Sequence, residues 1–137
     1  MLTDGVITDE HGLGIFRPGL LEEEFLSSRF GDEAEEDIFN GEYHSFDLES
    51  LNVEGTLFGA RIFFKGGKLW MLNLRKVTRQ VSWSDWSEAQ ELQVKQEHDR
   101  FLSENLGEGE RSFKWGKIES VFDGKSGVSW IVLRYLK

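Results

Sequence analysis

His98 and a run of carboxylates are the first side chains in this sequence that could do chemistry. His98 stands between Glu97 and Asp99, and an imidazole paired with a carboxylate is a common general base. On a helix, however, adjacent side chains point about 100° apart, so Asp99 would not face His98. His98 also falls on the apolar side of a helical pattern, where a histidine is more often a hydrogen-bonded core residue. We therefore predict a structural role for His98 and keep a place beside a ligand pocket as the alternative.

Other catalytic and metal-binding patterns fail. The glycine-rich stretch 12–19 lacks the Gly-Lys-Ser/Thr ending of a phosphate-binding loop. The acidic run 32–37 has Ala34 and Asp37 at the third and sixth positions, where a calcium loop needs an oxygen ligand and a glycine. The chain has no cysteine, which excludes disulfides, thiol catalysis and zinc–thiolate sites. The sequence therefore predicts a protein that is not an enzyme and holds no metal and no cofactor.

Charge is distributed unevenly along the 137 residues, whose net charge is −9. Residues 1–60 carry fifteen acidic and two basic side chains, whereas residues 61–137 carry ten acidic and fourteen basic ones. This balance argues against nucleic acid and anionic membranes as partners and suits a basic protein. The alternative is that the acidic residues only form a solvent-exposed surface and bind no partner. No signal-peptide pattern and no membrane-length apolar run is present, so we expect a cytoplasmic protein with no membrane contact.

Five residues are candidates for contact with a basic partner. Trp83 precedes the longest helical pattern in a polar stretch, where it would either pack on the first helical turn or anchor an interface. The other four belong to the acidic run, and the full set is Glu33, Glu35, Glu36, Asp37 and Trp83.

Two helices and several strands must position these residues. The first helix is predicted over Gly19–Phe30, with glutamates in its first turns and Gly31 at its end. The second is predicted over Trp86–Leu106, with Asp85 as N-cap, Glu88 completing a capping box and Gly107 as C-cap. The apolar stripe of this long helix consists of Val94, His98, Phe101 and Leu102, widened by Leu92 and Leu106.

The strands form two predicted hairpins. Gly66-Gly67 joins strands 61–65 and 68–75, and pairing Lys65 with Lys68 fixes the register. That register places Phe63, Trp70, Leu72 and Leu74 on one face, and Ile62, Phe64, Leu69 and Met71 on the other. Because both faces are apolar, this hairpin is predicted to be central and covered on both sides. The second hairpin pairs 113–122 with 128–136, whose apolar sequence predicts a central strand.

These elements predict an α+β fold in a single domain, residues 1–137. The predicted sheet has four to six mainly antiparallel strands, with the long helix packed on one face and the short N-terminal helix covering the other face or an edge.

From residue 25 onward the chain resembles a group of small acidic cytosolic proteins of bacteria. The similar stretches are Phe25–Ser28, Tyr43–Phe46, Trp83–Glu91, His98–Leu102, Asn105–Gly107 and Trp115–Ser129. The group's pattern is Trp-x-x-Trp-Ser-Glu, His-Asp, Trp-Gly and then Ser-x-Tyr/Phe-Asp, with Phe122 here where a tyrosine is expected. The resemblance carries no activity and no catalytic residue, and it implies an association with toxin and secretion loci.

The leading functional hypothesis is a non-enzymatic module that presents an acidic face to a basic protein, such as an immunity or inhibitor protein of a bacterial toxin. Two alternatives stay open. One is a small-ligand-binding domain or hydrolase with a pocket between sheet and helix near His98. The other is an assembly protein that buries its apolar hairpin faces as a homo-oligomer.

Overall fold

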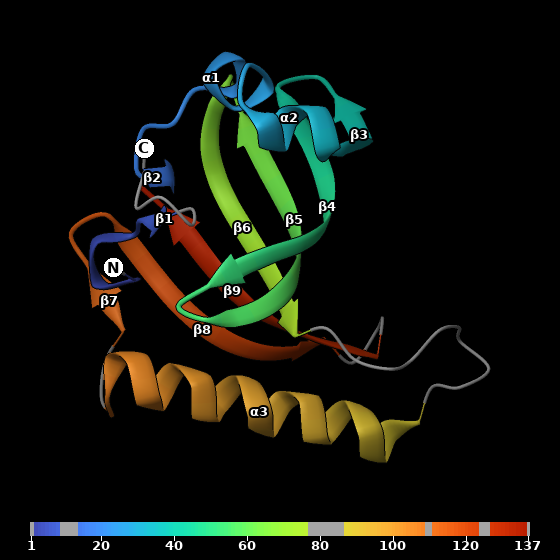
Figure 1. Ribbon diagram of the computed structural model, residues 1–137, viewed down its shortest axis with the longest axis vertical. Helices are drawn as coiled ribbons and strands as arrows, with labels where there is room; N and C mark the ends of the chain where they lie inside the picture. Colours follow the sequence, from blue (N-terminus) through green and yellow to red (C-terminus); the bar gives the residue numbers. More distant parts are fainter. Residues whose placement is uncertain (1, 9–13, 77–86, 109–110, 124–126, 137) are drawn as a thin grey trace.

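A seven-stranded antiparallel sheet and one long helix dominate the computed structural model, which describes residues 2–8, 14–76, 87–108, 111–123 and 127–136 (Figure 1). The strands are β3 (Glu35–Asn40), β4 (Tyr43–Val53), β5 (Thr56–Lys65), β6 (Lys68–Lys76), β7 (Ser112–Phe113), β8 (Gly116–Asp123) and β9 (Val128–Tyr135). Their order is β3-β4-β5-β6-β9-β8-β7, so the predicted central position of the last strand is confirmed. The α+β class is also confirmed, but the sheet exceeds the predicted four to six strands. The sequence analysis missed β3, and it merged β7 with β8.

The long helix α3 spans Glu88–Leu106 and contacts β6, β8 and β9 along one face of the sheet (Figure 1). Its N-cap is Ser87, whose hydroxyl oxygen accepts a hydrogen bond from the Gln90 N–H at 3.1 Å. The predicted cap, Asp85, lies outside the described residues, and Glu88 is the first helical residue instead of the partner in a capping box. Gly107 ends the helix as predicted, with φ of 77°.

The N-terminal helix is divided in two. Instead of one helix over Gly19–Phe30, the structure has α1 (Glu22–Leu26) and α2 (Arg29–Glu33). Ser28 separates them because its hydroxyl oxygen accepts a hydrogen bond from the Gly31 N–H and so caps α2. Gly31 therefore lies inside α2 and does not end a helix. A Cβ there would come within 2.6 Å of the Leu26 main chain, so the close approach of the two helices requires glycine.

The β5–β6 hairpin has the predicted turn and the predicted Lys65–Lys68 pair, but its register changes beyond them. Phe64 pairs with Leu69 and Phe63 with Met71, which leaves Trp70 as an extra residue in β6. A β-bulge of this kind reverses the alternation of the strand. Leu72 and Leu74 therefore lie on the buried face with Ile62, and the prediction that they share a face with Phe63 is wrong.

One face of the sheet carries most of the core. The strand residues Phe58, Ile62, Phe64, Leu72 and Leu133 are fully buried on it. The N-terminal segment covers part of this face through Phe25, whose ring contacts Phe46 and Phe64, and α3 covers another part through Phe101, which contacts Phe58. The N-terminal segment also contains the 3-10 turn η1 (Leu2–Asp4) and the small hairpin of β1 (Ile7–Thr8) and β2 (Gly14–Phe16).

The opposite face of the sheet is only partly covered. Phe63 and Trp70 are half-buried there, and all of the described helices lie on the other side. The prediction that both faces of the hairpin are covered is therefore wrong. Within the described residues, no helix is both long enough and apolar enough to cross a membrane.

Candidate functional site

The acidic run of the sequence lies on two different elements. Glu33 is the last residue of α2, whereas Glu35, Glu36 and Asp37 lie in β3, the edge strand of the sheet. The run is therefore divided between the end of a helix and an edge strand. Pairing with β4 holds these residues in a strand although glutamate and aspartate are poor strand formers, because tertiary context outweighs strand propensity.

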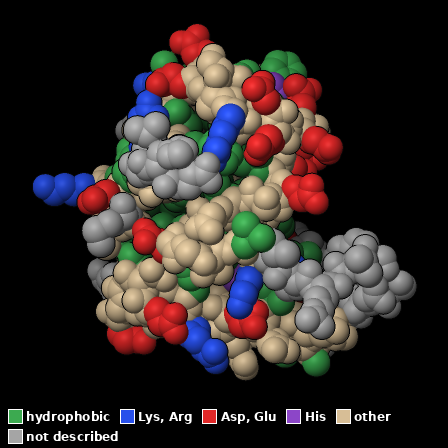
Figure 2. All heavy atoms as spheres, viewed as in Figure 1, with side chains coloured by type: hydrophobic (Ala, Val, Ile, Leu, Met, Phe, Trp, Pro, Cys, Tyr) green, Lys and Arg blue, Asp and Glu red, His purple; other side chains and the backbone are tan. Residues whose placement is uncertain are grey.

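Every residue of β3 is exposed to solvent. The acidic side chains of α1, α2 and β3 gather at one end of the molecule, where Figure 2 shows most of the red surface in that view. Glu33 and Glu35 make no ion pair with any residue in the described part of the chain. Their side chains are therefore available to a partner.

Two other carboxylates of the run, Glu36 and Asp37, have partners inside the chain. His44 lies between Glu22 and Glu36, with its Nδ1 at 2.8 Å from one carboxylate and its Nε2 at 2.9 Å from the other. Asp37 accepts a 3.5 Å hydrogen bond from the Ser45 hydroxyl and lies 3.5 Å from Arg61. Glu36 and Asp37 thus also fasten β3 to the sheet.

The same strand exposes apolar side chains and main-chain groups. Phe39 is 70% exposed and Ile38 is 51% exposed. The two-residue turn Gly41-Glu42 is closed by the pair Asn40–Tyr43, which in a hairpin of this type exchanges hydrogen bonds. By the alternation of an antiparallel ladder, the N–H and C=O of Phe39 then point away from β4, toward the open edge. The edge therefore combines carboxylates, two apolar side chains and unpaired main-chain groups.

These apolar residues were missed in the sequence analysis. Ile38 and Phe39 shortly precede Gly41, and a β-branched and an aromatic residue before a glycine turn are a signal for a strand. The fifth predicted contact residue, Trp83, lies outside the described residues.

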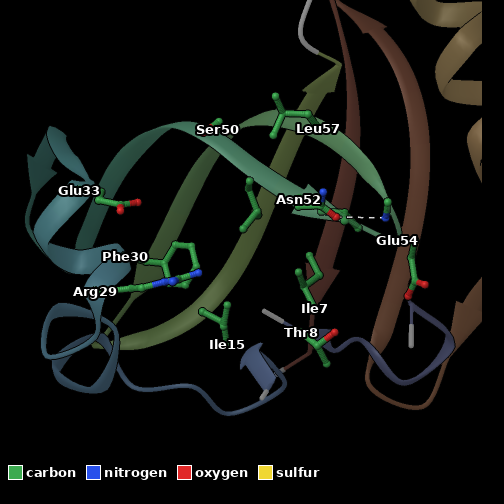
Figure 3. Close-up of a pocket in the computed structure, with 13 residues that line it drawn as sticks. Ile7, Thr8, Ile15, Arg29, Phe30, Glu33, Ser50, Asn52, Glu54 and Leu57 are labelled. Carbon is green, nitrogen blue, oxygen red and sulfur yellow. Dashed lines mark hydrogen bonds between the residues drawn. The ribbon is translucent and has the colours of Figure 1, made fainter. Parts of the chain in front are cut away.

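A pocket of about 460 Å³ opens between α2, the end of β4 and the β1–β2 hairpin (Figure 3). Arg29 and Glu33 extend toward it from α2, and Asn52 lies at the opposite wall, where its side-chain oxygen accepts a hydrogen bond from the Gly55 N–H at 3.1 Å. Glu54 adds a second carboxylate to the lining. One cation and two carboxylates favour no particular charge on a ligand.

His98, in the middle of α3, is fully buried against the sheet and does not line this pocket. Its Nε2 accepts a hydrogen bond from the Lys76 main-chain N–H at 3.0 Å. Burial, with a smaller contribution from the nearby Arg75, lowers the pKa of His98 to about 4. The ring is therefore neutral at pH 7, and the prediction of a hydrogen-bonded core histidine is confirmed.

Glu91 is a second buried polar residue of α3, and the sequence analysis overlooked it. One carboxylate oxygen accepts a hydrogen bond from the Ser129 N–H at 2.6 Å, and the other accepts one from Arg75 at 2.6 Å. The last β6–β9 pair is Leu74–Ile131, so Glu91 binds β9 just beyond the point where the two strands separate. Its position one turn before Val94 and two turns before His98 places it on the same stripe, which was a usable signal.

Within the described residues, no group of three or more histidine, aspartate or glutamate side chains is placed to hold a metal ion. The fold and its acidic edge define an α+β protein with an exposed, negatively charged edge strand. Comparison with protein-family models, with curated proteins and with solved structures finds no match to the chain. The resemblance noted in the sequence gains no support from these comparisons, and functional inference rests on the geometry.

Proposed function

We propose that the protein is a non-enzymatic binding module that presents the acidic edge strand β3 and the adjoining α2 to a basic segment of a partner protein. The observation that carries the proposal is the exposure of all six residues of β3 at the edge of the sheet, with Glu35, Glu36 and Asp37 among them.

An extended basic segment fits this edge in two ways. Its main chain can add a strand beside β3 by pairing with groups such as the N–H and C=O of Phe39. Its lysine and arginine side chains can then meet Glu33 and Glu35, which have no ion-pair partner within the described residues. Attraction between opposite charges chiefly raises the association rate and selects against acidic competitors.

Self-association through the same edge is disfavoured. Pairing two copies of β3 would place six carboxylates, Glu35, Glu36 and Asp37 from each copy, along one narrow seam. Charged residues on edge strands are a common device against this kind of pairing. The edge therefore rejects a second copy of β3 and accepts a strand of opposite charge, which favours a basic partner over self-association at this edge.

An immunity or inhibitor protein is the particular form of this proposal that we favour. Such a protein needs only to occupy a basic surface of its target, and an acidic edge of this kind supplies the complementary charge. No catalytic group is required.

The proposal is tested with a defined probe, an extended peptide of alternating lysine and threonine. We expect binding that weakens steeply with salt, with amide NMR shifts concentrated in β3. A peptide of alternating glutamate and threonine serves as the negative control. Shifts that map to another element, or equal binding of both peptides, would contradict the proposal.

A charge-matched pair of variants gives the second test. Glu33→Lys with Glu35→Lys alters the edge, and Glu104→Lys with Glu108→Lys makes the same change of charge on exposed residues at the end of α3. The edge variant should lower the association rate about tenfold, and the α3 variant much less, because charges that do not face the partner contribute little. The same two variants then serve to test partners captured from lysate. The α3 variant should still capture a true partner, and the edge variant should not.

A further inference from the structure

A second pocket, of about 560 Å³, lies where five segments of the chain meet. Its walls come from the loop before α1, the β3–β4 turn, the β5–β6 turn, the β7–β8 turn and the end of β9. It shares no residue with β3 or with the pocket in Figure 3.

Aromatic side chains form much of this pocket, namely Trp70, Trp115 and Tyr135. Two of them are held in place by the N-terminal turn. The Trp115 indole N–H donates to the main-chain oxygen of Thr3 at 2.8 Å, and the Tyr135 hydroxyl donates to that of Gly5 at 2.9 Å. Their rings contact each other with centroids 5.1 Å apart.

Two further contacts fix the position of Trp115. Its ring stacks on Phe113 with only 3° between the ring planes. It also lies so close to Gly5 that a Cβ there would be 2.5 Å from the indole. The Trp115 and Tyr135 rings are therefore fixed before a ligand binds, so binding does not carry the entropic cost of ordering them.

The charge of the pocket is opposite to that of the chain as a whole. Lys65, Lys68 and Lys114 line it with a single acidic residue, Glu42, although the chain has a net charge of −9. The Lys65 ammonium lies 5.5 Å from the Tyr43 ring and 5.9 Å from the Trp70 ring. Lys68 and Lys114 are exposed, and neither side chain has an ion-pair partner in the described part of the chain.

We infer that this pocket is a binding site for a small anionic molecule with a flat aromatic body. The half-buried rings of Trp70 and Trp115 offer an apolar surface against which such a body packs, and the buried Tyr135 ring supports Trp115 from the core side. The ammonium groups of Lys68 and Lys114 donate charge-assisted hydrogen bonds to a carboxylate, sulfonate or phosphate. The two features lie in the same cavity, so one ligand can use both.

The probe that tests this is anilinonaphthalene sulfonate, an aromatic anion whose fluorescence rises on binding to apolar surfaces. Phenylnaphthylamine has the same aromatic skeleton without the sulfonate and serves as the matched neutral probe. We expect the folded protein to bind one equivalent of the sulfonate more tightly than the neutral analogue. Equal affinity for the two probes, or no binding of the sulfonate, would overturn the inference.

A variant pair locates the site. Lys68→Gln with Lys114→Gln should weaken binding of the sulfonate about tenfold, the loss expected for two partly exposed charge-assisted contacts, and leave binding of the neutral probe unchanged. Arg100→Gln with Lys117→Gln removes the same charge from exposed side chains that lie outside the pocket and should change the affinity less than twofold. Thermal melts of both variants verify that the fold is retained. An equal loss in the two variants would mean a non-specific effect of charge and would overturn the site.

Competition distinguishes the anion. Adenosine monophosphate and naphthoate are each added to the protein with the sulfonate probe bound. Displacement by the first identifies a phosphate site, and displacement by the second identifies a carboxylate site. Displacement by neither would show that the pocket does not recognise this class of ligand and would overturn the inference.

Discussion

The Nε2 of His98 accepts a hydrogen bond from the main-chain N–H of Lys76 at 3.0 Å, which joins the middle of α3 to the last residue of β6. The acceptor nitrogen carries no proton, so the neutral ring holds its proton on Nδ1, which finds no partner among the described residues. Protonation of Nε2 would break the bond to Lys76 and bury a charge.

Stability should therefore depend on pH through His98. Burial lowers the pKa of His98 from 6.5 to about 4 in the folded chain. Between these pH values the unfolded chain binds a proton that the folded chain does not, so the free energy of unfolding falls as the pH is lowered. The contribution of His98 is complete above pH 6.5 and is lost by about pH 4, a decrease on the order of 3 kcal/mol.

Urea unfolding at several pH values measures this effect, and His98→Gln is the matched variant. Glutamine can still accept the hydrogen bond but does not titrate, so the variant should lose most of the decrease between pH 6.5 and pH 4. All other titratable residues are common to the two proteins. If the free energy of unfolding falls equally with pH in the two proteins, His98 is not the group responsible.

Glu91→Ala should destabilise the protein by about 3 kcal/mol, because it leaves Arg75 and the Ser129 N–H without their buried acceptor. Glu97→Ala is the control on the same helix, since its partly exposed pair with Lys76 should contribute less than about 1 kcal/mol. Chemical denaturation of the two variants gives both values. A similar cost for the two would contradict the role of Glu91 in holding β9.

Gly5→Ala should destabilise the N-terminal turn by more than about 2 kcal/mol, since the new Cβ would lie 2.5 Å from the Trp115 ring. Gly55→Ala makes the same change at a residue that also has positive φ but has open space around it, so only the backbone cost of about 1 kcal/mol is expected. The difference between their thermal melts isolates the contact with Trp115. Equal decreases in the melting temperatures of the two variants would mean that the Trp115 ring moves away from the new Cβ at no cost.

Phe39→Pro tests strand addition directly. Proline removes the N–H that faces the open edge, yet the hairpin bonds of Asn40 and Tyr43 remain, so the sheet should persist. The affinity for the lysine–threonine peptide should fall several-fold further than in Phe39→Ala, which removes only the side chain. Equal affinities of the two variants would show that the partner binds through side chains alone.

The sequence predicted those elements whose signals are local. The Gly66-Gly67 turn, the long helix with its end at Gly107 and the apolar final strand each follow from neighbouring residues, and the structure contains all three. The register beyond the turn was wrong because the bulge at Trp70 depends on how β6 packs, which strand periodicity does not encode.

The candidate site was predicted in part. The negative charge of Glu33–Asp37 was evident, but its division between α2 and β3 depends on pairing with β4. The aromatic pocket could not be predicted, because Trp70, Trp115 and Tyr135 come from separate strands and turns that only the folded sheet brings together.

The position of β9 has a consequence for biosynthesis. β9 follows every other strand of its sheet in the sequence, yet it lies between β6 and β8. While the ribosome is still making the β8–β9 hairpin, strands β3 to β6 have already been synthesised, and Leu72 and Leu74 of β6 lack their neighbours in β9. A nascent chain at this stage lacks the middle of its sheet, so it should be the form that chaperones bind and that aggregates when translation stalls.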